Sequence, residues 1–121
     1  MFRTSINALA LLAAAPIATP QAGAAERMTW KIRSTHPNIV YLKLFATRTG
    51  RAMPDDGQVY VLDDSKWHTI TAYCTKGEPI CYGASTKHRS AVWGLDRDGS
   101  DTCNDCCYSC GAYTRTITLS E

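Results

Sequence analysis

After its first 25 residues, the chain alternates hydrophobic and polar positions with a period of two, and turn-forming residues interrupt the alternation every eight to twelve positions. This alternation is typical of β-strands with one buried face, whereas a helix repeats its apolar positions every three or four residues. The pattern predicts six or seven short strands, and the clearest of them are 29–33, 39–45, 58–62, 67–73, 91–95 and 112–119.

The segment 39–45 is apolar at nearly every position, which predicts a central strand covered on both faces. Residues 47–57 are rich in glycine, proline and aspartate and predict an exposed loop. The turn 63–66 separates two strands, so we expect 58–73 to form a hairpin. Short strands at this spacing favour an all-β fold, a small antiparallel sandwich or barrel held together by disulfides.

One histidine lies in a predicted strand. His68 shares its face with Ile70 and Ala72, while the residues between them point to the other side. We interpret His68 as a structural histidine, because no serine, cysteine or carboxylate occurs at a spacing that imposes a catalytic triad. The sequence therefore gives no reason to expect an enzyme.

Residues 1–25 have the order of a secretory signal peptide: a basic residue, an apolar run at 8–15 and the small-residue triplet 22–24. The apolar run is shorter than the roughly 20 residues that span a bilayer. We expect cleavage after Ala24 or Ala25, a secreted or periplasmic location, and no membrane anchor afterwards. Residues 26–121 then form a single cysteine-rich β domain, since they are too few for two.

All six cysteines follow the predicted leader, at Cys74, Cys81, Cys103, Cys106, Cys107 and Cys110. An even number of cysteines in a small exported domain predicts disulfides. If 76–79 is a turn, Cys74 and Cys81 face each other across a hairpin at a distance that a disulfide can bridge, so we prefer that pair.

The other four cysteines then pair as 103–106 with 107–110, or as 103–107 with 106–110, because a bridge between Cys106 and Cys107 would strain the peptide between them. Six cysteines allow further pairings. One of these links the cluster at 103–110 to Cys74 and Cys81, and ties the last strand to the hairpin.

The cluster also allows two other kinds of chemistry. It can be divided into two adjoining C-x-x-C units, which zinc binds through thiolates, with Cys103, Cys106, Cys107 and Cys110 as the ligand set. A zinc site could instead use one of these pairs together with Cys74 and Cys81. A redox centre is the other alternative. Zinc ribbons keep their two pairs far apart in sequence, and an active C-x-x-C opens a helix, so both alternatives stand behind structural bridging.

An acidic loop precedes the cluster, with candidate calcium ligands at Asp96, Asp98, Ser100 and Asp101. Oxygen ligands at alternate positions suit calcium, and the loop resembles the start of an EF-type calcium site. Asp101 stands where that motif has its glycine, and Cys107 stands at its final glutamate position. Calcium is therefore a further alternative, beside an ordinary Asp/Gly turn.

The formal net charge is +2, and the basic residues are scattered without alternating with aromatics, so we expect no nucleic-acid partner. Aromatic residues are numerous, and their rings suit either the core or contact with a protein or glycan partner. We single out Trp93 and Tyr82, because each precedes a glycine that leaves a ring face uncovered. Gly94 itself indicates a bulge or a close backbone approach.

These observations predict an exported, disulfide-stabilised, non-enzymatic module that acts in binding or surface structure, through its aromatic residues and the polar loop 85–90. We expect no cofactor. Calcium and zinc remain the alternatives, at the acidic loop and the cysteine cluster.

Overall fold

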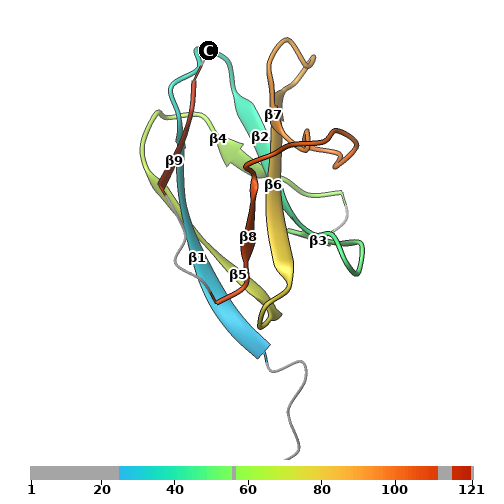
Figure 1. Ribbon diagram of the computed structural model, residues 1–121. Coiled ribbons are helices and arrows are strands. Elements are labelled where there is room, and N and C mark those ends of the chain that lie inside the picture. Colours follow the sequence, from blue (N-terminus) through green and yellow to red (C-terminus); the bar gives the residue numbers. More distant parts are fainter. Residues whose placement is uncertain (1–24, 56, 112–115, 121) are drawn as a thin grey trace, which may run out of the picture.

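A computed structural model describes residues 25–55, 57–111 and 116–120, which form nine β-strands and no helix. The strands make two sheets that pack face to face (Figure 1). The prediction of an all-β, disulfide-stapled sandwich is therefore confirmed. The described residues contain no helix long and apolar enough to cross a membrane. The predicted leader 1–25 lies outside the described residues, except for Ala25.

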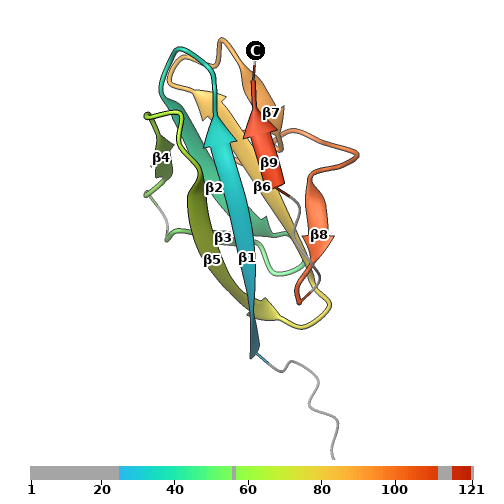
Figure 2. The same cartoon turned by 90° about the vertical axis from the view of Figure 1, so that its left-hand side faces the viewer.

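The smaller sheet, sheet A, has the strand order β5-β1-β9 and faces the viewer in Figure 2. In it β1 pairs antiparallel with β5 but parallel with β9, so the sandwich is not antiparallel throughout. Its strands are β1 (Ala25–Ser34), β5 (His68–Thr75) and β9 (Thr116–Leu119).

The larger sheet, sheet B, is built around two long strands that pair with each other, β2 and β6. Strand β2 also pairs with β3 and β4, and β6 with β7 and β8. The strands of sheet B are β2 (Val40–Ala46), β3 (Arg51–Met53), β4 (Tyr60–Leu62), β6 (Pro79–Thr86), β7 (Val92–Gly94) and β8 (Cys107–Ser109).

The main core lies between the two sheets and follows from the period-two alternation. On β1, Trp30 and Ile32 point inward and are fully buried, and on β2 Leu42 and Leu44 do the same. The Trp30 ring meets the ring of Tyr108 edge to face, with centroids 5.3 Å apart. Each large apolar side chain buried here contributes about 1.5–3 kcal/mol to folding. The core therefore fixes which face of each strand remains outside.

Two predicted hairpins are absent from the described part of the chain. Strand β4 belongs to sheet B and β5 to sheet A, so residues 63–67 connect the two sheets instead of forming a hairpin turn. Residues 76–78 do the same between β5 and β6. The alternation identified the main strands, but β4 and β5, and β5 and β6, pair with partners farther away in the chain because both faces of the core must be covered.

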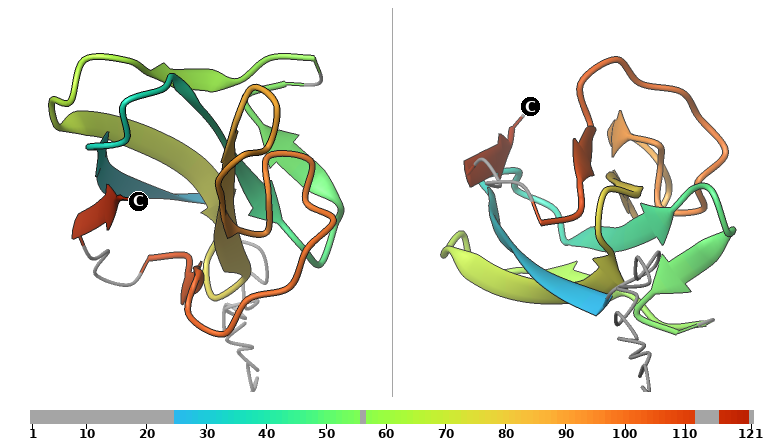
Figure 3. Two further views of the ribbon diagram at one scale, coloured as in Figure 1. Left: turned by 90° about the horizontal axis from the view of Figure 1, so that it is seen from above. Right: turned by 60° about the horizontal axis from the view of Figure 1, so that its bottom comes forward.

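A second, smaller core lies on the outer side of sheet B. The connection between β7 and β8, orange in Figure 3, crosses this side of the sheet, away from sheet A. It buries Leu95 and Cys106 against Cys81 of β6, and Phe45 of β2 packs beside them. This cover explains the apolar outer position of Phe45, whereas Ile39 at the other end of the segment is 45% exposed. Strand β3 within the predicted loop 47–57, and β8 within the cysteine cluster, were not predicted.

Candidate functional site

All six cysteines are paired, in the disulfides Cys74–Cys110, Cys81–Cys107 and Cys103–Cys106. The preferred bridge between Cys74 and Cys81 is wrong, because β5 and β6 lie in different sheets. The observed pairing is the alternative in which the cluster reaches both of these cysteines. Three disulfides fit an extracellular or otherwise oxidising compartment.

Each disulfide has a different structural role. Cys74–Cys110 joins sheet A to the end of β8 in sheet B. Cys81–Cys107 connects directly paired residues of β6 and β8. Cys103–Cys106 closes a short loop before β8. The bridges therefore hold the two layers together and fix the β7–β8 connection on sheet B.

Two of the disulfides are in contact. The Sγ atoms of Cys106 and Cys107, which belong to different bridges, lie 3.8 Å apart. With Cys81 they form a group of sulfur atoms that all lie within 4.8 Å of one another, the only such group of three metal-ligating side chains that the described residues contain. The predicted zinc set Cys103, Cys106, Cys107 and Cys110 shares only Cys106 and Cys107 with this group. Cys103 bonds to Cys106, and Cys110 bonds to Cys74.

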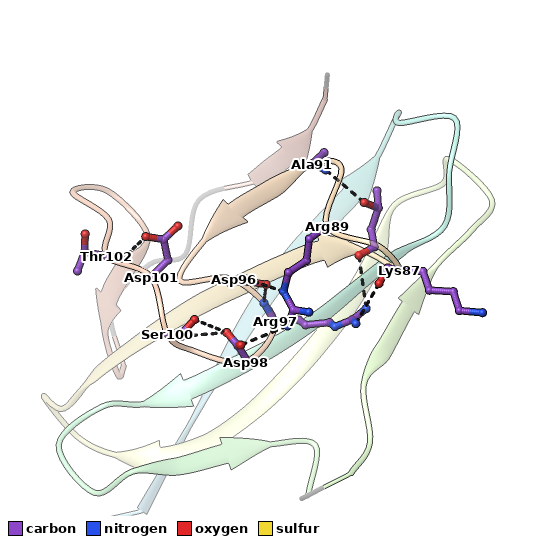
Figure 4. Close-up of polar contacts among 10 residues, drawn as sticks. Lys87, Arg89, Ala91, Asp96, Arg97, Asp98, Ser100, Asp101 and Thr102 are labelled. Carbon is purple, nitrogen blue, oxygen red and sulfur yellow. Dashed lines mark hydrogen bonds and ion pairs between the residues drawn. The ribbon is translucent and has the colours of Figure 1, made fainter.

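The acidic loop is organised by an arginine (Figure 4). Arg89 donates from Nε to Asp96, at 2.9 Å, and from Nη2 to Asp98, at 3.2 Å. The other oxygen of Asp96 accepts the backbone N–H of Arg97, and the other oxygen of Asp98 accepts the backbone N–H and hydroxyl of Ser100. Asp96 and Asp98, two carboxylates of the predicted calcium set, are therefore both paired with the guanidinium group of Arg89.

The remaining member of that set stands apart from this contact. Asp101 is exposed and accepts the backbone N–H of Thr102. The hydrogen bonds from Ser100, and then the charge of Arg89, lower the pKa of Asp98 below its ordinary value of 3.8. The hydrogen bond to Asp96 raises the pKa of Arg89. A cation at this loop would compete with Arg89 for the same oxygens.

Tyr82 and Trp93, the two aromatic residues singled out for contact with a partner, are half-buried and belong to β6 and β7 of sheet B. Tyr82 packs against Trp30 in the core, with ring centroids 6.1 Å apart, and burial raises the pKa of its hydroxyl. Trp93 donates its indole N–H to the backbone carbonyl of Ser120 and meets the ring of His36 edge to face. In the predicted polar loop 85–90, Ser85 is fully buried.

His68 has a carboxylate partner that its spacing in the sequence did not indicate. Its Nε2 lies 2.7 Å from Oδ1 of Asp64, in the turn before β5, and this contact is the main cause that lowers the pKa of Asp64. His68 also lines an open groove of about 300 Å³ between β4 and β5. The groove is lined by residues of these two strands, Tyr60, Val61 and Leu62 of β4 and His68, Thr69, Ile70 and Thr71 of β5.

Sequence reasoning missed the outer face of sheet A. Along β1, the positions between the core residues are Arg27, Thr29, Lys31 and Arg33, and they point to solvent. On β5 the outward positions carry threonines and Tyr73, which is 63% exposed. The described positions of β9 add Thr116 and Thr118.

The register of the strands aligns these side chains in rows. Lys31 lies between Thr69 of β5 and Thr116 of β9, and Arg27 lies beside Tyr73. Arg33 donates to the hydroxyl of Thr118, and its guanidinium group stacks 4.5 Å from the centre of the Trp67 ring. We call this surface the cationic face; it consists of Arg27, Thr29, Lys31, Arg33, Trp67, Thr69, Thr71, Tyr73, Thr116 and Thr118.

The cationic face combines three positive charges with hydroxyl groups, and no described outward position of β1, β5 or β9 carries a carboxylate. Strand residues rise by about 3.3 Å each, so Arg27 and Lys31 are about 13 Å apart and Lys31 and Arg33 about 7 Å. The odd-numbered basic positions of 27–33 would have revealed this row, had they been read as one strand face.

Comparisons with protein-family models, with curated proteins and with solved structures found no match to this chain.

Proposed function

We propose that this protein is an exported, non-enzymatic binding module whose cationic face binds an extended anionic polysaccharide. The observation that carries the proposal is the composition of that face: three cations and a set of threonine hydroxyls in rows, without an acidic residue among its described outward positions. Secretion or a periplasmic location, as the leader predicts, would bring the face into contact with such polymers.

The charges of the face are suited to a polymer rather than to a single small anion. Arg27, Lys31 and Arg33 stand in one line along β1, over about 20 Å. Cations grouped in this way create a positive potential that attracts a polyanion and weakens as salt screens it. A guanidinium group can also bind two oxygens of a sulfate or carboxylate at once.

The uncharged residues of the face favour a glycan among polyanions. Threonine hydroxyls both donate and accept hydrogen bonds, as sugar hydroxyls do. Tyr73 offers an exposed ring with a polar tip, on which the apolar side of a sugar ring can pack. Because Lys31 lies between two threonines, its charge and their hydroxyls can bind neighbouring groups of one chain.

The test is binding to a sulfated dextran, with uncharged dextran as the ligand control. We expect the triple variant R27Q/K31Q/R33Q to bind on the order of 100-fold more weakly, since each cation near an anionic surface contributes about 1 kcal/mol. The matched control is R48Q/K76Q/K87Q, which removes the same charge from exposed loops outside sheet A. It should keep nearly the full affinity.

Two outcomes would overturn the proposal. If both triple variants lose affinity equally, net charge rather than the cationic face determines binding. If duplex DNA binds as tightly as the sulfated dextran at the same salt concentration, the glycan part of the proposal is wrong. Unfolding curves of both variants show whether the fold is intact.

A further inference from the structure

The two disulfides on the outer side of sheet B place four sulfur atoms together. Cys81 comes from β6, Cys107 from β8, and Cys103 and Cys106 from the connection that crosses the sheet. Three of these sulfurs lie within 4.8 Å of one another, and the fourth is bonded to one of them. We propose that reduction of these two disulfides creates a tetrathiolate site for a thiophilic cation such as zinc, with Cys81, Cys103, Cys106 and Cys107 as ligands.

The distance between the two bridges supports this ligand set. The Sγ atoms of Cys106 and Cys107 are 3.8 Å apart without being bonded to each other. Two thiolates that each lie about 2.3 Å from one tetrahedral zinc ion are about 3.8 Å apart. These two sulfurs therefore already have the separation of neighbouring ligands. To complete a tetrahedron, the sulfurs of each bridge must move apart, and Cys103, which lies outside the close group of three, must also move toward Cys81 and Cys107.

The surroundings also suit a closed metal site. Cys81 and Cys106 are 2% exposed and pack in the smaller core with Leu95 and Phe45. Their positions are set by strand pairing between β6 and β8 and by a backbone hydrogen bond from Tyr82 N–H to the carbonyl of Cys106. Water is largely excluded from these sulfurs, and the scaffold that holds them does not depend on the two bridges alone.

The third disulfide is separate from this site and should be the last to be reduced. A reductant must reach one sulfur of a bridge, and Cys107 is exposed and Cys103 half-buried. Cys74 and Cys110 are 5% and 3% exposed. A mild reductant therefore opens the two bridges at the site while Cys74–Cys110 still joins the two sheets.

The chemistry balances with a dithiol as the reductant. Each bridge takes two electrons and two protons from one dithiol, which leaves as a cyclic disulfide, and gives two cysteine thiols. Zinc then binds four thiolates and releases their four protons. In the oxidised protein the same sulfurs are bonded in pairs and have no thiolate to offer, so the site is controlled by redox state.

The test starts from the native protein, reduced in steps under anaerobic conditions and alkylated at each step. Peptide masses should show Cys81, Cys103, Cys106 and Cys107 labelled while Cys74 and Cys110 remain bridged. Cobalt(II), added to this partly reduced protein as a spectroscopic probe, should give the sulfur-to-metal charge-transfer and visible bands of a tetrahedral tetrathiolate. Zinc should then displace the cobalt and protect the same four cysteines from alkylation.

Variants separate this ligand set from the contiguous one in the sequence. C81A/C107A should lose the tetrathiolate spectrum, and C74A/C110A should keep it. If C74A/C110A does not fold, the pattern of zinc protection in the wild-type protein decides between the two sets. Protection of Cys110 in place of Cys81, or no sulfur charge-transfer band after partial reduction, would overturn the proposal.

Discussion

At the scale of single residues, two glycines fix how the β7–β8 connection meets sheet B. Gly83 and Gly94 lie opposite each other where β6 pairs with β7. A Cβ atom on Gly83 would collide with the backbone carbonyl of Asp96, and one on Gly94 with the backbone carbonyl of Tyr82. The prediction that Gly94 marks a close backbone approach is confirmed, and these contacts, rather than exposed ring faces, explain both glycines.

Three glycine-to-alanine variants separate the physical causes. Gly77 has φ +87° and open space around it. The free energy of unfolding of G77A should therefore fall only by the strain of an alanine in the left-handed conformation, about 1–2 kcal/mol. G83A has a steric collision and G94A has a collision and a positive φ of +62°, so both should lose more than about 2 kcal/mol. Urea unfolding measures all three, and a smaller loss in G83A than in G77A would contradict this account.

At the scale of strands, the period-two alternation was sufficient to identify the main elements and their inner faces. Thr69, Thr71 and Tyr73 point outward on β5 as their positions indicate. The alternation contains no information on which strands pair, so the crossings from β4 to β5 and from β5 to β6 could not be predicted. The row of cations on β1 could be found from the alternation alone, but the threonines beside it depend on β1 lying between β5 and β9, which the alternation does not show.

The turn around Arg89 is the element whose electrostatics can be tested most directly. The side chain of Asp96 is 10% exposed and that of Asp98 is 50% exposed, and both contact Arg89. In double-mutant cycles with R89Q, we expect the coupling to D96N to exceed the coupling to D98N, because water screens the second pair. Equal couplings, measured by urea unfolding, would contradict this expectation.

The same turn should weaken in acid. Since the folded-state pKa of Asp98 is lower than its ordinary value of 3.8, its contribution to stability is fully present above that value and is lost as the pH falls through the lowered pKa. Below about pH 4, the D98N variant should therefore lose less stability with falling pH than the wild-type protein does. Melting temperatures of the two proteins across this pH range measure the difference.

At the scale of the whole molecule, the cysteine count was sufficient to predict a disulfide-stapled domain, but the pairing depended on the fold. Cys74 and Cys81 are close in sequence, yet their strands lie in opposite layers, and Cys110 reaches Cys74 only because β8 joins sheet B. Tyr113 and Arg115 of the predicted last strand lie outside the described residues, and β9 begins at Thr116.

The three bridges should differ in how much they stabilise the fold, because they close chain loops of different length. Their cysteines are separated by 36, 26 and 3 positions for Cys74–Cys110, Cys81–Cys107 and Cys103–Cys106. By restricting the unfolded chain, the three bridges should raise the free energy of unfolding by about 4, 3.5 and 2 kcal/mol, in the same order. Paired cysteine-to-alanine variants, unfolded in urea without reductant, should lose stability in that order.

The loss for Cys74–Cys110 should exceed this expectation, since that bridge is the covalent connection between the two sheets. If C103A/C106A proves the most destabilising pair, the short bridge supports the β7–β8 connection by packing in the smaller core rather than by restricting the unfolded chain.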